Sequence, residues 1–215
     1  DGSYRSVVDE KAGKARNWNL GRLSSRENPL VIFTLTTQAV IGAFMLLFLG
    51  PMISPEYFGL LAESGVFYPL LVTLILIQGG GLFLSTLHLG KPMRFYRGFN
   101  NLRWAPLSRE ALGIAMFFAG LPGFTVLSAI NEWLQFEWVE ALISIAGYFA
   151  VVTSLIGLYF MHCIYRVKAR PFWNHWQVLT SFFGTTMSAG GLLFGLFAAS
   201  AYGLADLSFT ALLSM

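Results

Sequence analysis

Hydrophobic residues fill five long stretches of this chain, and polar residues are confined to the segments between them. Each stretch holds about the 20 apolar residues that an α-helix needs to cross the hydrocarbon core of a bilayer. The predicted spans are Pro29–Leu49, Val66–Leu87, Ala111–Ile130, Ala141–Tyr165 and Val178–Ala205. The pattern predicts an all-α, polytopic transmembrane helix bundle over residues 29–215, preceded by a polar, basic tail over residues 1–28.

Composition narrows the class further. Of the residues, 55% are hydrophobic and only 12% are charged, whereas a soluble domain carries about a quarter charged residues. The single Cys163 excludes an internal disulfide and a thiolate-ligated iron–sulfur cluster within this chain. The apolar residues 207–215 begin what reads as a sixth span, and we therefore expect that the chain is incomplete at its C-terminus.

Charge is distributed unequally between the two predicted membrane faces. The tail, the second loop and the fourth loop hold all 14 Lys and Arg residues and five of the 11 acidic residues. The opposite loops hold the other six acidic residues and no Lys or Arg. By the positive-inside rule, the N-terminus and the basic loops are predicted to be cytoplasmic.

Three ionisable residues lie where predicted spans meet the basic face: His88, Glu110 and His162. An ionisable group at membrane depth is costly, so each is a functional candidate. Quinone chemistry moves two protons with two electrons and needs proton-handling groups, which His88 and Glu110 could provide. Glu110 could instead only cap a helix N-terminus, and His162 could be purely structural.

Small residues and a neighbouring arginine extend this candidate site. Gly79, Gly80 and Gly81 could let a flat ring approach the second predicted span, although small residues are also common where membrane helices pack together. Arg109 and His162 are the other candidates for a quinone pocket. No catalytic residue and no metal site are expected in this chain.

Several motifs resemble the membrane anchor subunit of the dimethyl sulfoxide reductase family. The central one is Ser85-Thr-Leu-His-Leu-Gly-Lys-Pro-Met-Arg-Phe-Tyr-Arg97, followed by Leu107-Ser-Arg-Glu110. The segments Asn28-Pro-Leu-Val-Ile-Phe-Thr34 and Arg170-Pro-Phe-Trp-Asn-His-Trp176 agree with the same family. Members of this family usually have about eight helices, so three are missing here.

The resemblance implies a non-catalytic anchor that binds menaquinone or ubiquinone. Its expected protein partners are a four-cluster iron–sulfur subunit and a molybdopterin catalytic subunit. The iron–sulfur clusters and the molybdopterin belong to those subunits. Membrane lipids are expected around the chain, and no nucleic acid is expected to bind it. In the family, the residues that correspond to His88 and Glu110 are implicated in quinol oxidation. The expected location is the bacterial inner membrane.

Orientation separates two subtypes of such an anchor. In the best-known members the motif loop faces the periplasm, whereas the charge distribution here places it in the cytoplasm. This orientation resembles the anchor of membrane-bound sulfite dehydrogenases, which would pass electrons from sulfite into quinone. The alternative is a quinol-oxidising anchor of a dimethyl sulfoxide reductase-type enzyme.

Basic and aromatic residues of the loops are predicted to dock the iron–sulfur subunit, by charge complementarity and buried aromatic area. These residues are Lys91, Arg94, Arg97, Arg103, Trp104, Arg166, Arg170 and Trp173. The tryptophans could instead form an ordinary aromatic belt.

Three other classes of protein stay open. A transporter would have helix breaks at Pro69, Gly79–Gly81 and Pro122, and a cytochrome subunit would hold a b-type haem between His88 and His162. A scaffold without redox function is the third. The haem is the weaker reading, because nothing in the sequence turns the two histidines toward each other.

Overall fold

The computed structural model describes residues 28–62, 64–87, 89, 92–166 and 173–204. Within them, five helices are long and apolar enough to cross a membrane, which confirms the predicted bundle. They are α2 (Asn28–Ile53), α4 (Phe67–Leu87), α5 (Pro106–Leu134), α6 (Glu137–Tyr165) and α7 (Trp176–Leu204). Two short elements that the hydrophobic pattern did not predict are α3 (Pro55–Ala62) and the 3-10 helix η1 (Pro92–Phe99).

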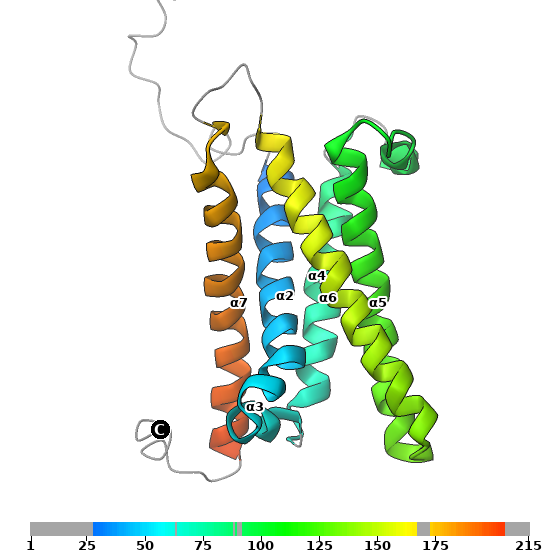
Figure 1. The fold of residues 1–215 in the computed structure, drawn as a ribbon, viewed down its shortest axis with the longest axis vertical. Helices are drawn as coiled ribbons and strands as arrows, with labels where there is room; N and C mark the ends of the chain where they lie inside the picture. Colours follow the sequence, from blue (N-terminus) through cyan, green and yellow to red (C-terminus); the bar gives the residue numbers. More distant parts are fainter. Residues whose placement is uncertain (1–27, 63, 88, 90–91, 167–172, 205–215) are drawn as a thin grey trace, which may run out of the picture.

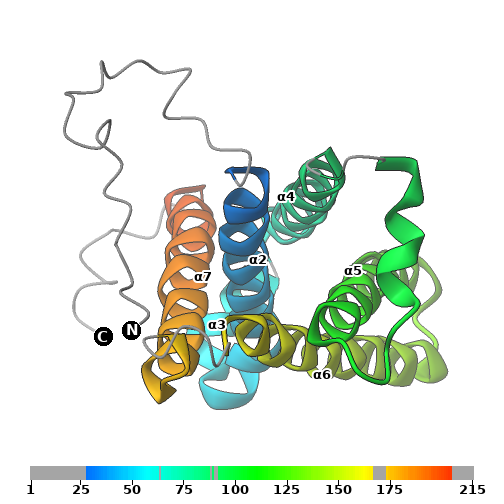
Figure 2. The same cartoon turned by 90° about the horizontal axis from the view of Figure 1, so that it is seen from above.

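The helices lie side by side, with α2 in contact with α3, α4, α6 and α7 (Figure 1). Helices α5 and α6 form an antiparallel pair that closes the other side of the bundle (Figure 2). The turn between α5 and α6 is tight because Gln135 adopts a left-handed conformation (φ 49°) and its N–H donates to the Asn131 carbonyl.

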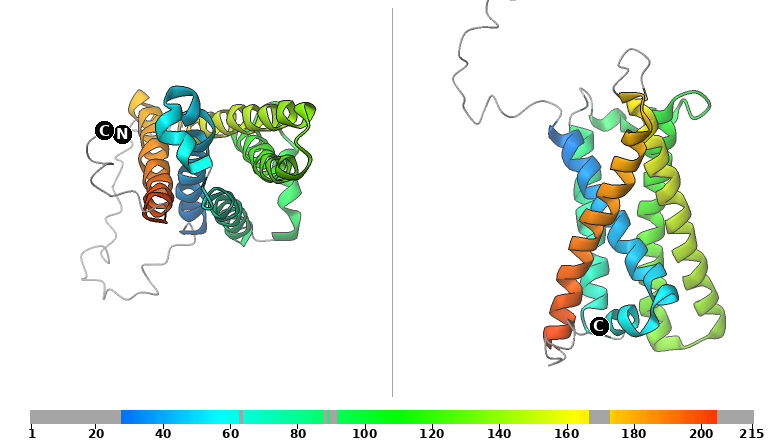
Figure 3. Two further views of the ribbon diagram at one scale, coloured as in Figure 1. Left: turned by 90° about the horizontal axis from the view of Figure 1, so that it is seen from below. Right: turned by 60° about the vertical axis from the view of Figure 1, so that its left-hand side comes forward.

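The bundle has a basic end and an acidic end, and the described charged residues other than Glu110 are separated by sign between them. At the basic end α2, α5 and α7 begin, α4 and α6 end, and η1 lies beside them; the acidic end holds α3 and the α5–α6 turn (Figure 3). The described arginines all lie at the basic end: Arg94, Arg97, Arg103, Arg109 and Arg166. The described acidic residues, except Glu110, lie at the acidic end: Glu56, Glu132, Glu137 and Glu140.

Glycines let two helix pairs approach at backbone distance. A Cβ added to Gly113 of α5 would lie 2.8 Å from the Cα of Gly157 on α6. A Cβ added to Gly42 of α2 would collide with the Thr186 carbonyl oxygen on α7 and lie 3.0 Å from the Cα of Gly190. Close packing of small residues is a main source of attraction between helices in lipid, where no hydrophobic effect drives them together.

Aromatic rings fill the space between α2, α5 and α6. The Phe44 ring centroid lies 5.5 Å from that of Phe124 in an edge-on arrangement, and the Phe48 centroid lies 5.1 Å from that of Tyr148. Such edge-to-face pairs are favoured by the quadrupoles of the rings. This cluster ties the α5–α6 pair to the central helix α2.

The helix breaks expected of a transporter are not seen. Helix α4 runs without interruption through Gly79–Gly81, and α5 runs through Pro122. Pro69 lies in the first turn of α4, where a proline costs little because the first N–H groups have no partner in the helix. The described spans therefore lack the feature on which the transporter hypothesis depended.

Candidate functional site

Glu110 is a buried carboxyl group at the basic end of the bundle. Helix α5 begins at Pro106, after extended Ala105, so Glu110 lies one full turn inside the helix and not in its first turn. Its side chain is only 5% exposed, and no hydrogen bond or ion pair to it is found among the described residues. This position differs from that of a simple helix cap, and burying a carboxyl group without a partner is costly.

His162 is the second buried ionisable group at this end. It lies in the last turn of α6 and is 3% exposed. Its Nδ1 lies 2.6 Å from the carbonyl oxygen of Tyr159, and the two rings are 5.1 Å apart. An Nδ1–H that donates to this carbonyl leaves Nε2 as a hydrogen-bond acceptor. The antiparallel packing of α5 and α6 places His162 and Glu110 at the same end, but no hydrogen bond or ion pair joins these two described residues.

Arg109 makes contacts that differ from those expected of a quinone ligand. Its Nε donates to the Leu102 carbonyl at 2.7 Å, and its Nη2 donates to the Arg103 carbonyl. Its guanidinium group also lies 5.2 Å from the ring centroid of Phe160 on α6. The donors on one edge of this side chain are therefore engaged by the protein itself.

The three glycines of α4 have different surroundings. A Cβ on Gly81 would lie 2.7 Å from Oγ1 of Thr36 on α2, and a Cβ on Gly79 would lie 3.4 Å from the Phe118 ring on α5. A Cβ on Gly80 would meet nothing within 4 Å. Gly81 thus lies at a helix contact too close for a Cβ, a Cβ on Gly79 would make an ordinary van der Waals contact, and Gly80 faces open space.

The remaining predicted residues lie in the loops of the basic end, or outside the described residues. His88, Lys91 and Arg170 lie outside them; in the sequence, His88 follows Leu87, the last residue of α4. Trp104 is 75% exposed, with the Arg103 guanidinium 5.1 Å from its ring centroid.

The two ends of the fourth loop that the structure describes contact each other. Arg166 donates from Nε to Asn174 Oδ1 at 3.3 Å. The Trp173 ring centroid lies 5.6 Å from that of Tyr165, and the Trp173 side chain is nevertheless exposed. The Arg166 guanidinium group is therefore hydrogen-bonded to a polar side chain of its own loop.

Helix η1 adds residues that the sequence analysis missed. It lies at the outer edge of the bundle beside α5 (Figure 2), and the exposed Met93, Phe95 and Tyr96 alternate with Arg94 and Arg97. Alternation of basic and apolar residues was the available signal, but eight residues are too few to stand out in a hydrophobicity window. The basic end thus presents a mixed apolar and cationic surface.

Gln78 was also missed, because only ionisable residues of the spans were considered. It is fully buried on α4. Its Nε2 donates to Thr37 Oγ1 on α2 at 3.1 Å, and its Oε1 has no partner. A single glutamine in an apolar run was the signal that could have found this interhelical contact.

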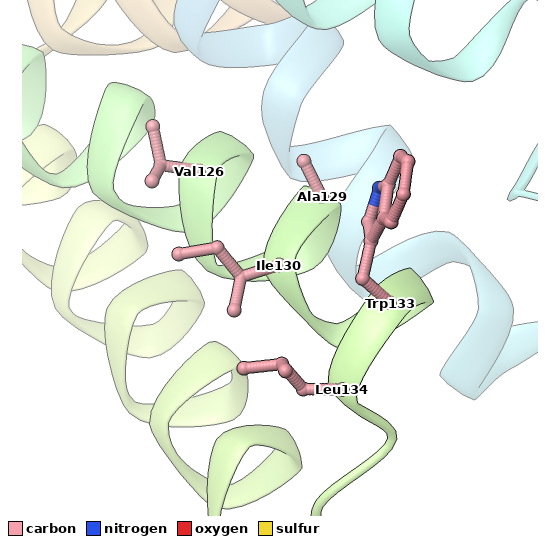
Figure 4. Close-up of a pocket in the computed structure, with 5 residues that line it drawn as sticks. All are labelled: Val126, Ala129, Ile130, Trp133 and Leu134. Carbon is pink, nitrogen blue, oxygen red and sulfur yellow. The ribbon is translucent and has the colours of Figure 1, made fainter.

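A surface hollow of about 420 Å³ lies far from these groups. It is lined by Val126, Ala129, Ile130, Trp133 and Leu134, all on the last turns of α5 (Figure 4). At 1.5 Å per residue, the hollow lies at least roughly 24 Å along α5 from Glu110. It is almost entirely apolar, so it belongs to the lipid-facing surface of the acidic end and not to the candidate site.

The fold and the composition define a multi-pass α-helical membrane protein. Residues 23–215 match the family model described as DMSO reductase anchor subunit (DmsC), and the chain belongs to this family. Relatives include the C subunits of two anaerobic dimethyl sulfoxide reductases. The one from Haemophilus influenzae is 28% identical over 172 residues, and the one from Escherichia coli K12 is 30% identical over 177 residues.

A further relative is the E. coli K12 protein YnfH, also named as a subunit of an anaerobic dimethyl sulfoxide reductase, which is 28% identical over 174 residues. The three alignments cover 76–79% of this chain and 56% of each relative. The chain therefore spans little more than half the length of these relatives. No solved structure matches the chain significantly.

Proposed function

We propose that this chain is the membrane anchor of a molybdopterin oxidoreductase and holds a quinone head group beside Glu110. Electrons would pass between this quinone and an iron–sulfur subunit docked on the basic end. The observation that carries the proposal is the buried carboxyl group of Glu110, which has no hydrogen-bond or ion-pair partner among the described residues and lies at the basic end. Membership of the anchor family supports the same assignment.

The residues of the site fit a group whose oxygen atoms exchange protons. A bound quinone supplies two-electron chemistry with two protons. The Glu110 carboxylate can accept a hydrogen bond and a proton from a hydroxyl group, because no partner among the described residues competes for its oxygens. His88 provides the second proton-handling group in the proposal, since it ends the second predicted span on the same face.

Docking at the basic end relies on two kinds of contact. Exposed arginines of η1 and of the following turn attract an acidic partner surface and orient it. Trp104, which is largely exposed, offers apolar area that docking would bury. The proposed partners are a four-cluster iron–sulfur subunit and, through it, a molybdopterin catalytic subunit.

Sulfite oxidation coupled to quinone reduction is the subtype that we propose. Its support is the charge asymmetry, which by the positive-inside rule places the docking end in the cytoplasm of a bacterial inner membrane. A quinol-oxidising anchor is the second candidate, because the relatives are named as subunits of anaerobic dimethyl sulfoxide reductases. The two differ in the direction of electron flow.

The decisive experiment replaces Glu110 by Gln in the assembled complex. Quinone-dependent turnover should fall by about a hundredfold or more, as expected when a positioned acid–base group is removed. Turnover with a soluble redox dye, which bypasses the quinone, should be unchanged. Glu137→Gln is the matched control, because Glu137 is exposed at the acidic end.

Wild-type quinone turnover in the Glu110→Gln complex would overturn the site. The subtype is tested by identifying the subunits that copurify and by offering sulfite or dimethyl sulfoxide as substrate. Reduction of quinone by sulfite supports the dehydrogenase. Oxidation of quinol by dimethyl sulfoxide supports the reductase.

A further inference from the structure

Arg109 joins three separate parts of the basic end. Its backbone belongs to the first turn of α5, its side chain donates to two successive carbonyls of the preceding turn, and its guanidinium face packs on Phe160 of α6. Trp104 and Ala105 complete that turn, because the N–H of each donates to the Asn101 carbonyl. The turn over residues 101–105 is thus fixed to both helices of the α5–α6 pair.

This arrangement depends on the shape of the guanidinium group. Nε and Nη2 lie on one edge of a planar fork and point in nearly the same direction, so they can bind two neighbouring carbonyl oxygens at once. A lysine has one ammonium group on a flexible stem and cannot reproduce this fork. Charge alone would therefore not replace Arg109.

Arg103 and Glu110 lie on either side of this contact. Arg103 belongs to the proposed docking surface, and Glu110 belongs to the proposed quinone site. Arg103, whose carbonyl accepts from Arg109, carries its side chain over exposed Trp104 on the docking surface. Glu110, the next residue after Arg109, is buried in the candidate quinone site. The Arg109 fork adds a side-chain connection between the docking turn and the start of α5, beside the backbone hydrogen bonds that the Ser108 and Arg109 N–H groups donate to the Ala105 carbonyl.

We propose that Arg109 is a positioning residue, which holds the docking turn and the Glu110-bearing turn in a fixed relation without contacting the quinone. This inference rests on the proposed function. Loss of the fork would let the docking turn and the start of α5 shift against each other, and a less rigidly held Glu110 would bind the quinone head group more weakly.

The test compares Arg109→Ala, Arg109→Lys and Phe160→Leu with Glu110→Gln in the assembled complex. Arg109→Ala should raise the KM for a short-chain quinone about tenfold with a smaller change in kcat, whereas Glu110→Gln should mainly lower kcat. The KM of Arg109→Lys should lie between those of Arg109→Ala and the wild type. Phe160→Leu, which keeps the fork, should stay within about twofold of the wild type.

Binding of the fluorescent quinol analogue 2-heptyl-4-hydroxyquinoline N-oxide gives an independent readout in the same membranes. Its Kd should follow the KM across the series. If the complex with Arg109→Ala does not assemble, the comparison of Arg109→Lys with the wild type is the test.

Three results would overturn the inference. The first two are an Arg109→Lys complex equal to the wild type and a Phe160→Leu complex as impaired as Arg109→Ala. Either would show that charge or ring stacking, and not the fork, sets the site. An impaired Glu110→Gln with an unaffected Arg109→Ala would also reject it while leaving the proposed function intact. A normal Glu110→Gln would reject the proposed function itself.

Discussion

Gln78 on α4 donates a hydrogen bond to Thr37 on α2 in the interior of the bundle, and the second half of its amide has no partner. Reversing the assignment of the amide oxygen and nitrogen would still leave one group unpaired, because Thr37 offers a single hydroxyl. The contact therefore fixes the register of the two helices while a buried polar atom goes unsatisfied.

Substitutions at the two members of this pair should have unequal effects on stability. Thr37→Val leaves the whole buried amide unpaired and should lower the free energy of unfolding by about 1–3 kcal/mol. Gln78→Leu removes the unpaired group and should be nearly neutral, since interhelical hydrogen bonds in membranes contribute only about 0.6 kcal/mol on average. The measurement is unfolding of the purified protein in mixed micelles.

The double variant Thr37→Val/Gln78→Leu serves as the control for this pair. It should recover most of the stability lost in Thr37→Val. A double variant as unstable as Thr37→Val alone would show that the valine acts through packing and that the amide is irrelevant.

The glycine contact between α5 and α6 gives a second prediction. Gly113→Ala places a methyl group 2.8 Å from backbone atoms of Gly157, and such overpacking costs about 1–3 kcal/mol. Gly123→Ala on the same helix meets nothing within 4 Å and should not destabilise the protein. Thermal unfolding in detergent compares the two, and equal midpoints would contradict the close approach described above.

Docking of the iron–sulfur subunit should depend on charge at the basic end only. Arg97→Glu reverses an exposed charge of η1 and should weaken retention of that subunit on the membrane by about tenfold at low salt, with a smaller effect at high salt because exposed charges are screened. Glu137→Lys changes the opposite end by the same amount of charge. Copurification at several salt concentrations gives the measurement, and a loss caused by both variants would argue against docking at the basic end.

The orientation of the bundle can be measured with cysteines, because Cys163 is the single cysteine of the chain. In a Cys163→Ser background, Asn100→Cys should react with a membrane-impermeant maleimide only after the cytoplasmic side is opened. Glu137→Cys should react from the outside in intact spheroplasts. The reverse pattern would place the docking end in the periplasm and favour the quinol-oxidising alternative.

The membrane spans could be predicted from the sequence, because a helix that crosses lipid needs a long apolar segment. The residues at which the helices begin and end were predicted less accurately. Hydrophobicity predicted a helix beginning at Ala111, whereas α5 begins at Pro106. Backbone hydrogen bonding continues through polar residues, and a proline is well suited to the first position of a helix. This difference of about one turn decides whether Glu110 appears as a cap or as a buried side chain inside the helix.

The contacts of the site required the packed structure. Residue type alone singled out Glu110 and His162, since ionisable groups are rare in spans. The structure adds that both are buried, and that the Arg109 donors are engaged by the carbonyls of Leu102 and Arg103. Sequence could not supply that result, because the direction of a side chain depends on how helices from distant parts of the chain pack.

Helices α5 and α6 each have 29 residues, which corresponds to a length of roughly 43 Å, against a hydrocarbon thickness of about 30 Å. A membrane helix rarely tilts enough to hide that excess, so the tip of the pair stands in the headgroup layer. Trp133 and Trp138, which are 87% and 61% exposed, lie at this tip and are suited to that layer. These tryptophans anchor the tip of α5 in one headgroup layer. The length of α5 from that layer therefore sets how deep Glu110, near the other end of the helix, lies in the membrane.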